Sequence, residues 1–100
     1  MTTEETKNAE GYSIFIGGKP FMNYVTGLVG QFNDGAEEVI IKARGKFISK
    51  GVDVAEIARR KFLEDKNVAV KKITIGSEEF KNKEGKVINV SILEIILKRN

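Results

Sequence analysis

Lysine and arginine are the residues whose number and spacing indicate a chemical task, and they are concentrated in the middle of the chain. Segment 42–61 contains seven of these cations and two acidic residues, so it carries a net charge of +5, whereas the whole chain carries +3. This concentration favours a polyanionic partner. A solvated helix face explains the same composition equally well. The cations are Lys42, Arg44, Lys46, Lys50, Arg59, Arg60 and Lys61.

The segment Gly17-Gly18-Lys19-Pro20 lies between an expected strand and an expected helix. Glycines allow a backbone to approach a phosphate closely, and the N-terminus of a helix favours an anion. The segment is not a P-loop, because the pattern GxxxxGK[ST] is absent. It is therefore either a phosphate contact or an ordinary turn between a strand and a helix.

A second basic group, Lys42, Arg44 and Lys46, surrounds the end of an expected strand. The alternation of apolar and polar residues places Lys42 and Arg44 on the face opposite the core. The planar guanidinium of Arg44 can bind a phosphate or a base edge. The alternative is a charged sheet edge without a ligand.

A third basic group, Lys81, Lys83 and Lys86, lies at the tip of an expected hairpin, where three glutamates balance it formally. A long arm can still turn its lysines to one side and reach into a groove of DNA. The alternative is a solubilising hairpin, whose charges prevent pairing between the sheet edges of different molecules.

The amino-acid composition gives little support for an enzyme or for a metal-binding protein. The chain contains no histidine and no cysteine, so the commonest general base, the commonest zinc ligand and the thiol nucleophile are all missing. The remaining carboxylates include adjacent pairs at the ends of elements, and adjacent strand residues face opposite ways. The sequence predicts a binding protein that is not an enzyme and has no cofactor, metal or small-molecule substrate.

The chain has no run approaching the roughly 18 apolar residues of a transmembrane helix. Residues 1–10 lack the basic start and apolar centre of a signal peptide. We expect a disordered tail over residues 1–11, followed by one domain over residues 12–100, in a cytoplasmic protein that does not associate with membranes.

Hydrophobic periodicity predicts an α+β domain with the order β-α-β-α-β-β, closed by a long hairpin. A change of parity at residues 71–72 predicts a β-bulge. Gly51 is expected to weaken the first turns of the second helix, so that this helix starts nearer Asp53. The buried stripe of the helix is expected to include Val52 and Phe62. The expected strands cover 12–16, 37–43, 68–75 and 87–97, and the expected helices cover 20–32 and 47–64.

Two stretches closely resemble the archaeal Alba proteins: IGGKPFMNYV at residues 16–25 and IKARGKFISK at residues 41–50. The similarity covers essentially everything from residue 14 onward, and the combination of the two stretches is specific. It continues through Val52-Asp53, Glu56-Ile57, Arg60, Phe62-Leu63, Asp65, Gly76-Ser77 and the strand 90–98.

This resemblance implies a βαβαββ two-layer sandwich, similar to the C-terminal domain of a bacterial translation initiation factor. It also implies a long hairpin arm between the third and fourth strands. It further implies a homodimer with its two arms held apart, which coats and compacts double-stranded DNA on the chromosome with little sequence preference. Some members of the family bind RNA.

The resemblance also implies roles for single residues. Lys19 matches a DNA-contacting lysine of the family's loop, and Arg44 matches an arginine that faces the nucleic acid. Phe62 matches an apolar position through which dimers pack against each other on DNA. The supporting positions are the basic residues Lys42, Lys46, Lys50 and Lys86 and the loop residues Gly17, Gly18, Asn23 and Tyr24.

The chain departs from the family pattern at two basic positions. Many members have two consecutive loop lysines, and acetylation of the first weakens binding. Here the first position is Gly18, and a basic position on the arm is Asn89. Both changes predict weaker phosphate binding, or a different balance between DNA and RNA.

Four functional hypotheses follow. The first is a chromatin protein that binds duplex DNA, and the second is an RNA-binding protein, either an RNA chaperone or a subunit of the RNase P type. The third is a small enzyme acting on a phosphate or acyl-phosphate through Arg44 and Asn23. The fourth is a structural dimer without salt-sensitive affinity for nucleic acid.

Overall fold

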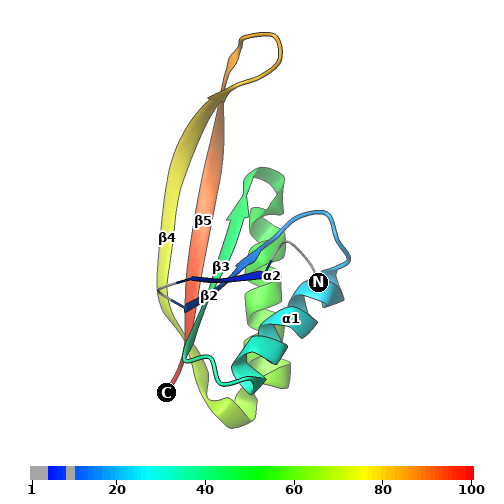
Figure 1. Ribbon diagram of the computed structural model, residues 1–100, viewed down its shortest axis with the longest axis vertical. Helices are drawn as coiled ribbons and strands as arrows, with labels where there is room; N and C mark the ends of the chain where they lie inside the picture. The colour runs from blue at the N-terminus through cyan, green and yellow to red at the C-terminus, as the bar shows by residue number, and fades with distance from the viewer. Residues whose placement is uncertain (1–4, 9–10) are drawn as a thin grey trace.

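One sheet and two helices form the body of the protein, and a long hairpin projects beyond it (Figure 1). The computed structural model describes residues 5–8 and 11–100, and it measures 49 × 25 × 25 Å. The sheet has the strand order β1-β2-β3-β5-β4. Its strands are β1 (Glu5–Asn8), β2 (Gly11–Phe15), β3 (Glu38–Arg44), β4 (Val68–Lys81) and β5 (Val87–Arg99).

From β2 onward, the chain has the predicted α+β architecture and the predicted order of elements. Strands β2 and β3 are parallel and are joined through a helix, whereas β5 runs antiparallel to both β3 and β4. Strand β5, which contains the most apolar run of the sequence, lies between β3 and β4.

Strand β1 lies inside the segment for which the sequence predicted a disordered tail. Its backbone pairs antiparallel with the free edge of β2, where unpaired N–H and C=O groups accept an additional strand. Residues 1–4, 9 and 10 lie outside the described part of the chain. The division into a tail ending at residue 11 and a domain starting at residue 12 stays a prediction.

The two helices cover one face of the sheet (Figure 1). Helix α1 (Phe21–Asn33) begins directly after Pro20, and α2 (Ile48–Ile57) follows a 3-10 turn, η1 (Gly45–Phe47). A π-helical turn, η2 (Ala58–Phe62), and a 3-10 turn, η3 (Glu64–Lys66), divide the C-terminal part of what the sequence predicted as one helix.

Two expectations about the second helix were wrong. Helix α2 begins at Ile48, before Gly51, so its start is not shifted toward Asp53, and Gly51 is buried against the sheet. Val52 and Phe62 are exposed by 41% and 48%, respectively, whereas Val54 is buried. The buried stripe of α2 is therefore rotated away from Val52.

The core lies between the helices and the sheet. Alternate residues of β3 face it: Val39 and Ile41 have no exposed surface, and Ala43 is 5% exposed. This alternation leaves Lys42 and Arg44 on the opposite face of the sheet, as predicted. Other residues of the core include Ile14, Val25, Leu28, Phe32, Val54, Leu63 and Leu97.

The predicted bulge in β4 is confirmed by a register shift between Val70 and Lys72. Lys71, the extra residue, donates a hydrogen bond of 2.7 Å to Glu38 on β3. This bond lowers the pKa of the Glu38 carboxyl below its usual value of 4.5, and the charge of Lys98 acts in the same direction. The bulge is thereby tied to the body of the sheet.

The arm formed by β4 and β5 extends further than the apolar pattern indicated, because β4 continues through the polar segment to Lys81. The tip closes through Asn82, whose side-chain oxygen accepts hydrogen bonds from the N–H groups of Glu84 and Lys86 at 2.9 and 3.0 Å. Gly85 has a φ of 81°, a conformation that glycine adopts readily.

Candidate nucleic-acid interface

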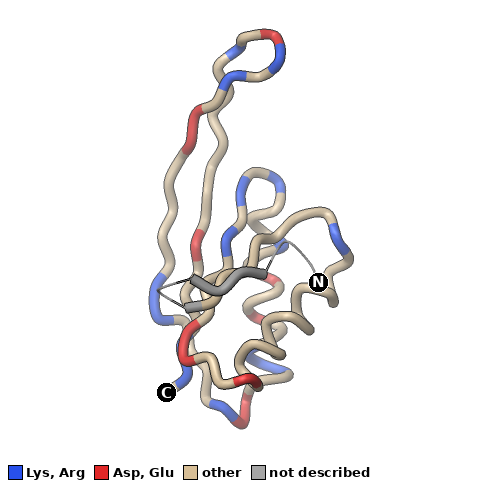
Figure 2. The backbone as a smooth tube through the Cα atoms, in the orientation of Figure 1, with Lys and Arg blue, Asp and Glu red and all other residues tan. Residues whose placement is uncertain are grey.

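Three basic segments project toward the same end of the molecule (Figure 2). They are the loop between β2 and α1, the η1 turn after β3, and the tip of the arm. The loop and the η1 turn lie on the body, and the tip of the arm extends beyond them in the same direction. A long polyanion could contact all three segments at once.

The buried side chain of Tyr24 supports the loop between β2 and α1. Its side chain is 3% exposed, and its hydroxyl oxygen accepts hydrogen bonds from the backbone N–H groups of Gly17 at 3.0 Å and Lys19 at 3.1 Å. The first turn of α1 contains Tyr24, and side chains there point back toward the helix N-terminus. The buried hydroxyl therefore fixes the backbone conformation of the loop.

Lys50 of α2 holds the same loop from its other side. Its ammonium group donates hydrogen bonds to the carbonyl oxygens of Gly17 at 2.8 Å and Lys19 at 2.5 Å. The nitrogen also lies 5.0 Å from the centroid of the Tyr24 ring, a distance typical of a cation–π contact. The sequence identified Lys50 as a supporting cation, and the structure directs its charge toward the protein backbone.

The outer side of the loop carries Gly18 and Lys19, which are both exposed. A Cβ atom added to Gly18 would meet no heavy atom within 4 Å. Packing therefore does not require a glycine at this position. Asn23 is exposed, and its backbone N–H donates to the Pro20 carbonyl at 3.0 Å.

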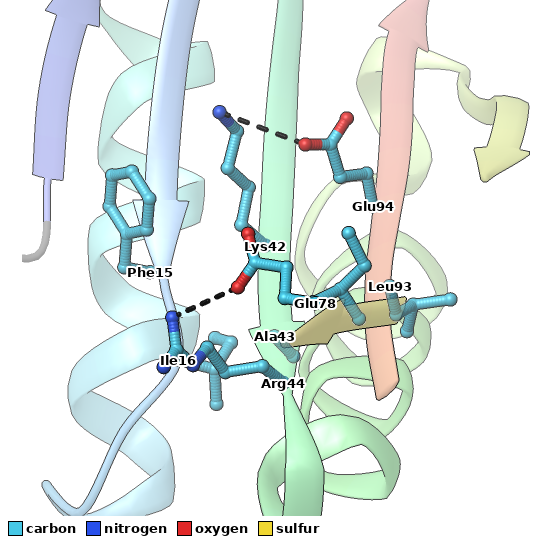
Figure 3. Close-up of a pocket in the computed structure, with 9 residues that line it drawn as sticks. Phe15, Ile16, Lys42, Ala43, Arg44, Glu78, Leu93 and Glu94 are labelled. Atoms are coloured by element: carbon cyan, nitrogen blue, oxygen red, sulfur yellow. Dashed lines mark hydrogen bonds and ion pairs between the residues drawn. The ribbon is translucent and has the colours of Figure 1, made fainter. Parts of the chain in front are cut away.

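Arg44 and Lys42 lie on the sheet face opposite the helices, which we call the outer face (Figure 3). Arg44 forms an ion pair of 3.3 Å with Glu78 of the arm, and its guanidinium lies 6.0 Å from the centroid of the Phe80 ring. The Arg44 side chain is 59% exposed, so this ion pair is weak and can exchange for a stronger anionic partner.

Lys42 has the same kind of surroundings as Arg44. It lies 3.8 Å from the Glu94 carboxylate and 5.3 Å from the centroid of the Phe15 ring. Lys42 and Arg44 thus each lie close to one carboxylate and one aromatic ring. No sequence pattern indicated these partners, because they come from different strands.

The remaining predicted basic residues are exposed. Lys46 lies in η1, with its nitrogen 5.4 Å from the Phe47 ring centroid. Lys81, Lys83 and Lys86 lie at the end of the arm and in its turn. Glu84 lies in the same turn and reduces the local positive charge.

Phe62 lies at the end of η2, apart from the three basic segments. In the preceding turn, Arg59 donates two hydrogen bonds to Glu56, at 2.8 and 3.0 Å. These bonds lower the pKa of the Glu56 carboxyl and raise that of the Arg59 guanidinium. The exposed ring of Phe62 adjoins a helix surface that is rich in charge.

Other kinds of site gain no support from the geometry. In residues 5–8 and 11–100, no three acidic side chains come close enough together to hold a metal ion. No helix in this part of the chain combines the length and apolar character required to cross a bilayer. The groove that Arg44 lines does not include Asn23, although the enzyme hypothesis required these two residues to converge.

Comparison with known proteins identifies relatives over most of the chain. The Alba family profile matches residues 13–77. The chain is 55% identical to the DNA/RNA-binding protein Alba of Methanocella arvoryzae, over 86% of this chain and 88% of the relative. It is also 55% identical to the DNA/RNA-binding protein Alba 1 of Archaeoglobus fulgidus, over 85% and 92%, respectively.

A solved structure confirms the fold. Alba from Thermoplasma volcanium superposes with a TM-score of 0.80 and 50% sequence identity, and the match covers 87% of this chain and 99% of that protein. The match thus spans nearly the whole of that structure. Sequence and fold agree, and the chain belongs to the Alba family.

Proposed function

We propose that this chain is a double-stranded DNA-binding chromatin protein that coats and compacts DNA as a homodimer, and that it also binds RNA. The position of the three basic segments toward one end of the molecule carries this proposal. The names of the two close relatives, which both describe DNA/RNA-binding proteins, support it. In a cell, the protein would be cytoplasmic and associated with the chromosome.

Phosphate neutralisation explains how the basic segments act. Lys19 on the loop, Arg44 and Lys46 after β3, and the arm lysines contact phosphates and release counterions from the nucleic acid. Backbone contacts of this kind orient the protein without reading the sequence. Any discrimination arises from the shape of the groove. The protein therefore covers DNA with little sequence preference.

The decisive test is binding to duplex DNA over a series of salt concentrations, with the Arg44→Ala variant in parallel. We expect the affinity of the parent chain to fall steeply with salt. Because one phosphate contact is lost, Arg44→Ala should bind more weakly and should reduce the slope of log K against log salt by about 0.9. Fluorescence anisotropy with a labelled duplex measures both quantities.

Glu78→Gln is the matched control, because it removes the carboxylate that pairs with Arg44. This variant should bind DNA more tightly than the parent, since Arg44 is released and a charge that repels phosphate is removed. Absent or salt-insensitive binding by the parent would exclude the DNA role. An RNA or protein partner would then be the better explanation.

A homodimer accounts for apolar surface that the monomer leaves in water. Ile73 and Ile75 are 59% and 78% exposed, although they pair with the buried residues Ile95 and Leu93 and so face the helix side of the sheet. Val52 of α2 is also exposed. We expect Ile75→Lys to convert a dimer into a monomer in sedimentation equilibrium, because it places a charge in this apolar surface. A parent chain that sediments as a monomer would contradict the proposal.

Phe62 is proposed to join neighbouring dimers on DNA. The 48% exposure of its ring leaves it available for such a contact. We expect Phe62→Ala to reduce the cooperativity of coating on long DNA, while affinity for a duplex that holds a single dimer stays nearly unchanged. Electrophoretic mobility shifts on long and short duplexes compare the two quantities. Unchanged cooperativity would exclude this role for Phe62.

RNA as the main partner is the alternative, either for an RNA chaperone or for a subunit of the RNase P type. Gly18 removes one cation expected to contact phosphate, which weakens phosphate binding or changes the balance between DNA and RNA. A-form duplexes also present a wide, shallow minor groove with 2′-hydroxyl groups. Competition between DNA and RNA duplexes of the same sequence decides between the two partners.

A further inference from the structure

The outer face of the sheet contains a groove of about 270 Å³ that the proposed duplex contacts do not explain. The strand register determines which residues line this groove side by side, because directly paired residues face the same side of a sheet. Phe15, Lys42 and Glu94 form one row across β2, β3 and β5. Arg44, Ile92 and Gly76 form the next row, across β3, β5 and β4.

Two exposed aromatic rings lie on this face. Phe15 is 41% exposed and lines the groove, and Phe80 is 42% exposed and lies beside it on the arm. Lys42 lies over the first ring and Arg44 over the second, at 5.3 and 6.0 Å from the centroids. Aromatic rings accompanied by cations are the elements of a stacking surface for the bases of single-stranded nucleic acids.

Gly76 keeps the middle of the groove open. It is a glycine in the interior of β4, where the lack of a side chain weakens a strand and marks positions of close approach by a ligand. A Cβ atom at Gly76 would lie 3.5 Å from the Ile92 side chain, in ordinary contact. A Cβ atom therefore fits without a clash, and a side chain added at this position would cover the apolar floor that Ile92 provides.

The charges of the groove suit a base better than a phosphate. Glu78 and Glu94 balance Arg44 and Lys42, so these four side chains carry no net charge. Carboxylate oxygens accept hydrogen bonds from amino groups on the edges of bases, as glutamate does with cytosine. The groove is also slightly smaller than the roughly 300 to 1,000 Å³ of most small-molecule pockets. It can accommodate one flat ring system, with the backbone of the strand outside.

We propose that this groove binds an unpaired nucleobase of a single-stranded nucleic acid. The base lies over Ile92 and stacks against Phe80 beside the groove, and its amino edge faces Glu78. Lys42 and Arg44 neutralise the neighbouring phosphates. Paired bases of a duplex are already stacked and cannot enter, so this activity is separate from the proposed coating of DNA. Bases with an exocyclic amino group bind better than uracil or thymine.

The test uses short labelled single strands: oligocytidine and oligouridine, each as RNA and as DNA, and an abasic strand of the same length. We expect cytidine strands to bind more tightly than uridine strands, and both more tightly than the abasic strand. Phe80→Ala should weaken binding to cytidine strands about tenfold. Its affinity for duplex DNA should change less than twofold. The RNA and DNA strands show which backbone is preferred.

Three further variants distinguish a loss of stacking from a loss of folded structure. Phe80→Tyr keeps a stacking ring and should bind like the parent, whereas Phe80→Leu keeps apolar volume and should lose as much affinity as Phe80→Ala. Gly76→Val should lose single-strand binding while its melting temperature stays equal or rises, because valine favours strands.

Equal binding of abasic and cytidine strands would overturn the proposal, since only phosphates would then be bound. Parent-like affinity of Phe80→Leu would also overturn it. Loss of duplex binding alone would contradict the proposed function and leave this inference standing, because the two measurements use different ligands and Phe80 is not a proposed duplex contact. Loss of cytidine preference in Glu78→Ala would confirm the placement of the amino edge.

Discussion

The Lys50→Met variant is expected to bind duplex DNA about tenfold more weakly than the parent chain, with nearly the same dependence on salt. Lys50 donates hydrogen bonds to two carbonyl oxygens of the loop that carries Lys19. Methionine preserves much of the aliphatic stem and removes these hydrogen-bond donors. The loop is then no longer held in one conformation. No phosphate contact is removed, and therefore the number of counterions released should hardly change.

Lys19→Ala is the control for this prediction, because its salt dependence should differ from that of Lys50→Met. It removes a proposed phosphate contact, so it should weaken binding and also reduce the salt slope by about 0.9. Lys50→Arg should recover part of the lost affinity, because a guanidinium can donate to the same carbonyl oxygens. A slope for Lys50→Met as shallow as that of Lys19→Ala would show instead that Lys50 contacts phosphate directly.

The sequence contained enough information to predict most elements of the fold. Alternating residues in β3 separate Val39 and Ile41 from Lys42 and Arg44, and this period of two is a local property of the chain. The shift of parity that predicted the bulge is local as well, and the structure places the register shift there. The β-α-β-α-β-β order follows from such signals, because they specify which face of each element is buried.

Contacts between distant segments could not be predicted in the same way. Lys50 and Gly17 are 33 residues apart, and Arg44 and Glu78 are 34 apart. Whether a lysine faces a phosphate or a backbone carbonyl depends on the packing of α2 beside the loop. The sequence therefore identified Lys50 as a basic residue of interest, and only the structure reveals its carbonyl partners.

The packing of α2 also explains the wrong expectation for Gly51. Helix propensity describes the local backbone, and on that scale glycine is unfavourable by about 1 kcal/mol. The structure adds a tertiary constraint, because a Cβ atom at Gly51 would lie only 3.0 Å from the Ala43 Cβ and 3.6 Å from Ile16 Cγ1. The helix approaches the sheet closely at this point, and glycine allows that approach.

Gly51→Val should therefore destabilise the protein by about 3 kcal/mol, even though it removes a glycine from a helix. Added atoms in a well-packed core force the surrounding structure to move, at a cost of roughly 1 to 3 kcal/mol or more. Valine is also a poor helix former, so little propensity is gained in return. Urea unfolding of the variant and the parent chain measures the difference. Because α2 carries Lys50, the displaced helix should also weaken duplex binding.

Gly30→Ala tests the same reasoning at a position where the expected change in stability has the opposite sign. Gly30 also lies inside a helix, α1, but a Cβ atom there would meet nothing within 4 Å. Only propensity changes, so alanine should stabilise the protein by about 0.5 to 1 kcal/mol. If both variants were stabilising, α2 would have room to move away from the sheet. If both were destabilising, helix propensity would not determine stability at Gly30, and the loss at Gly51 could no longer be attributed to contact with Ala43.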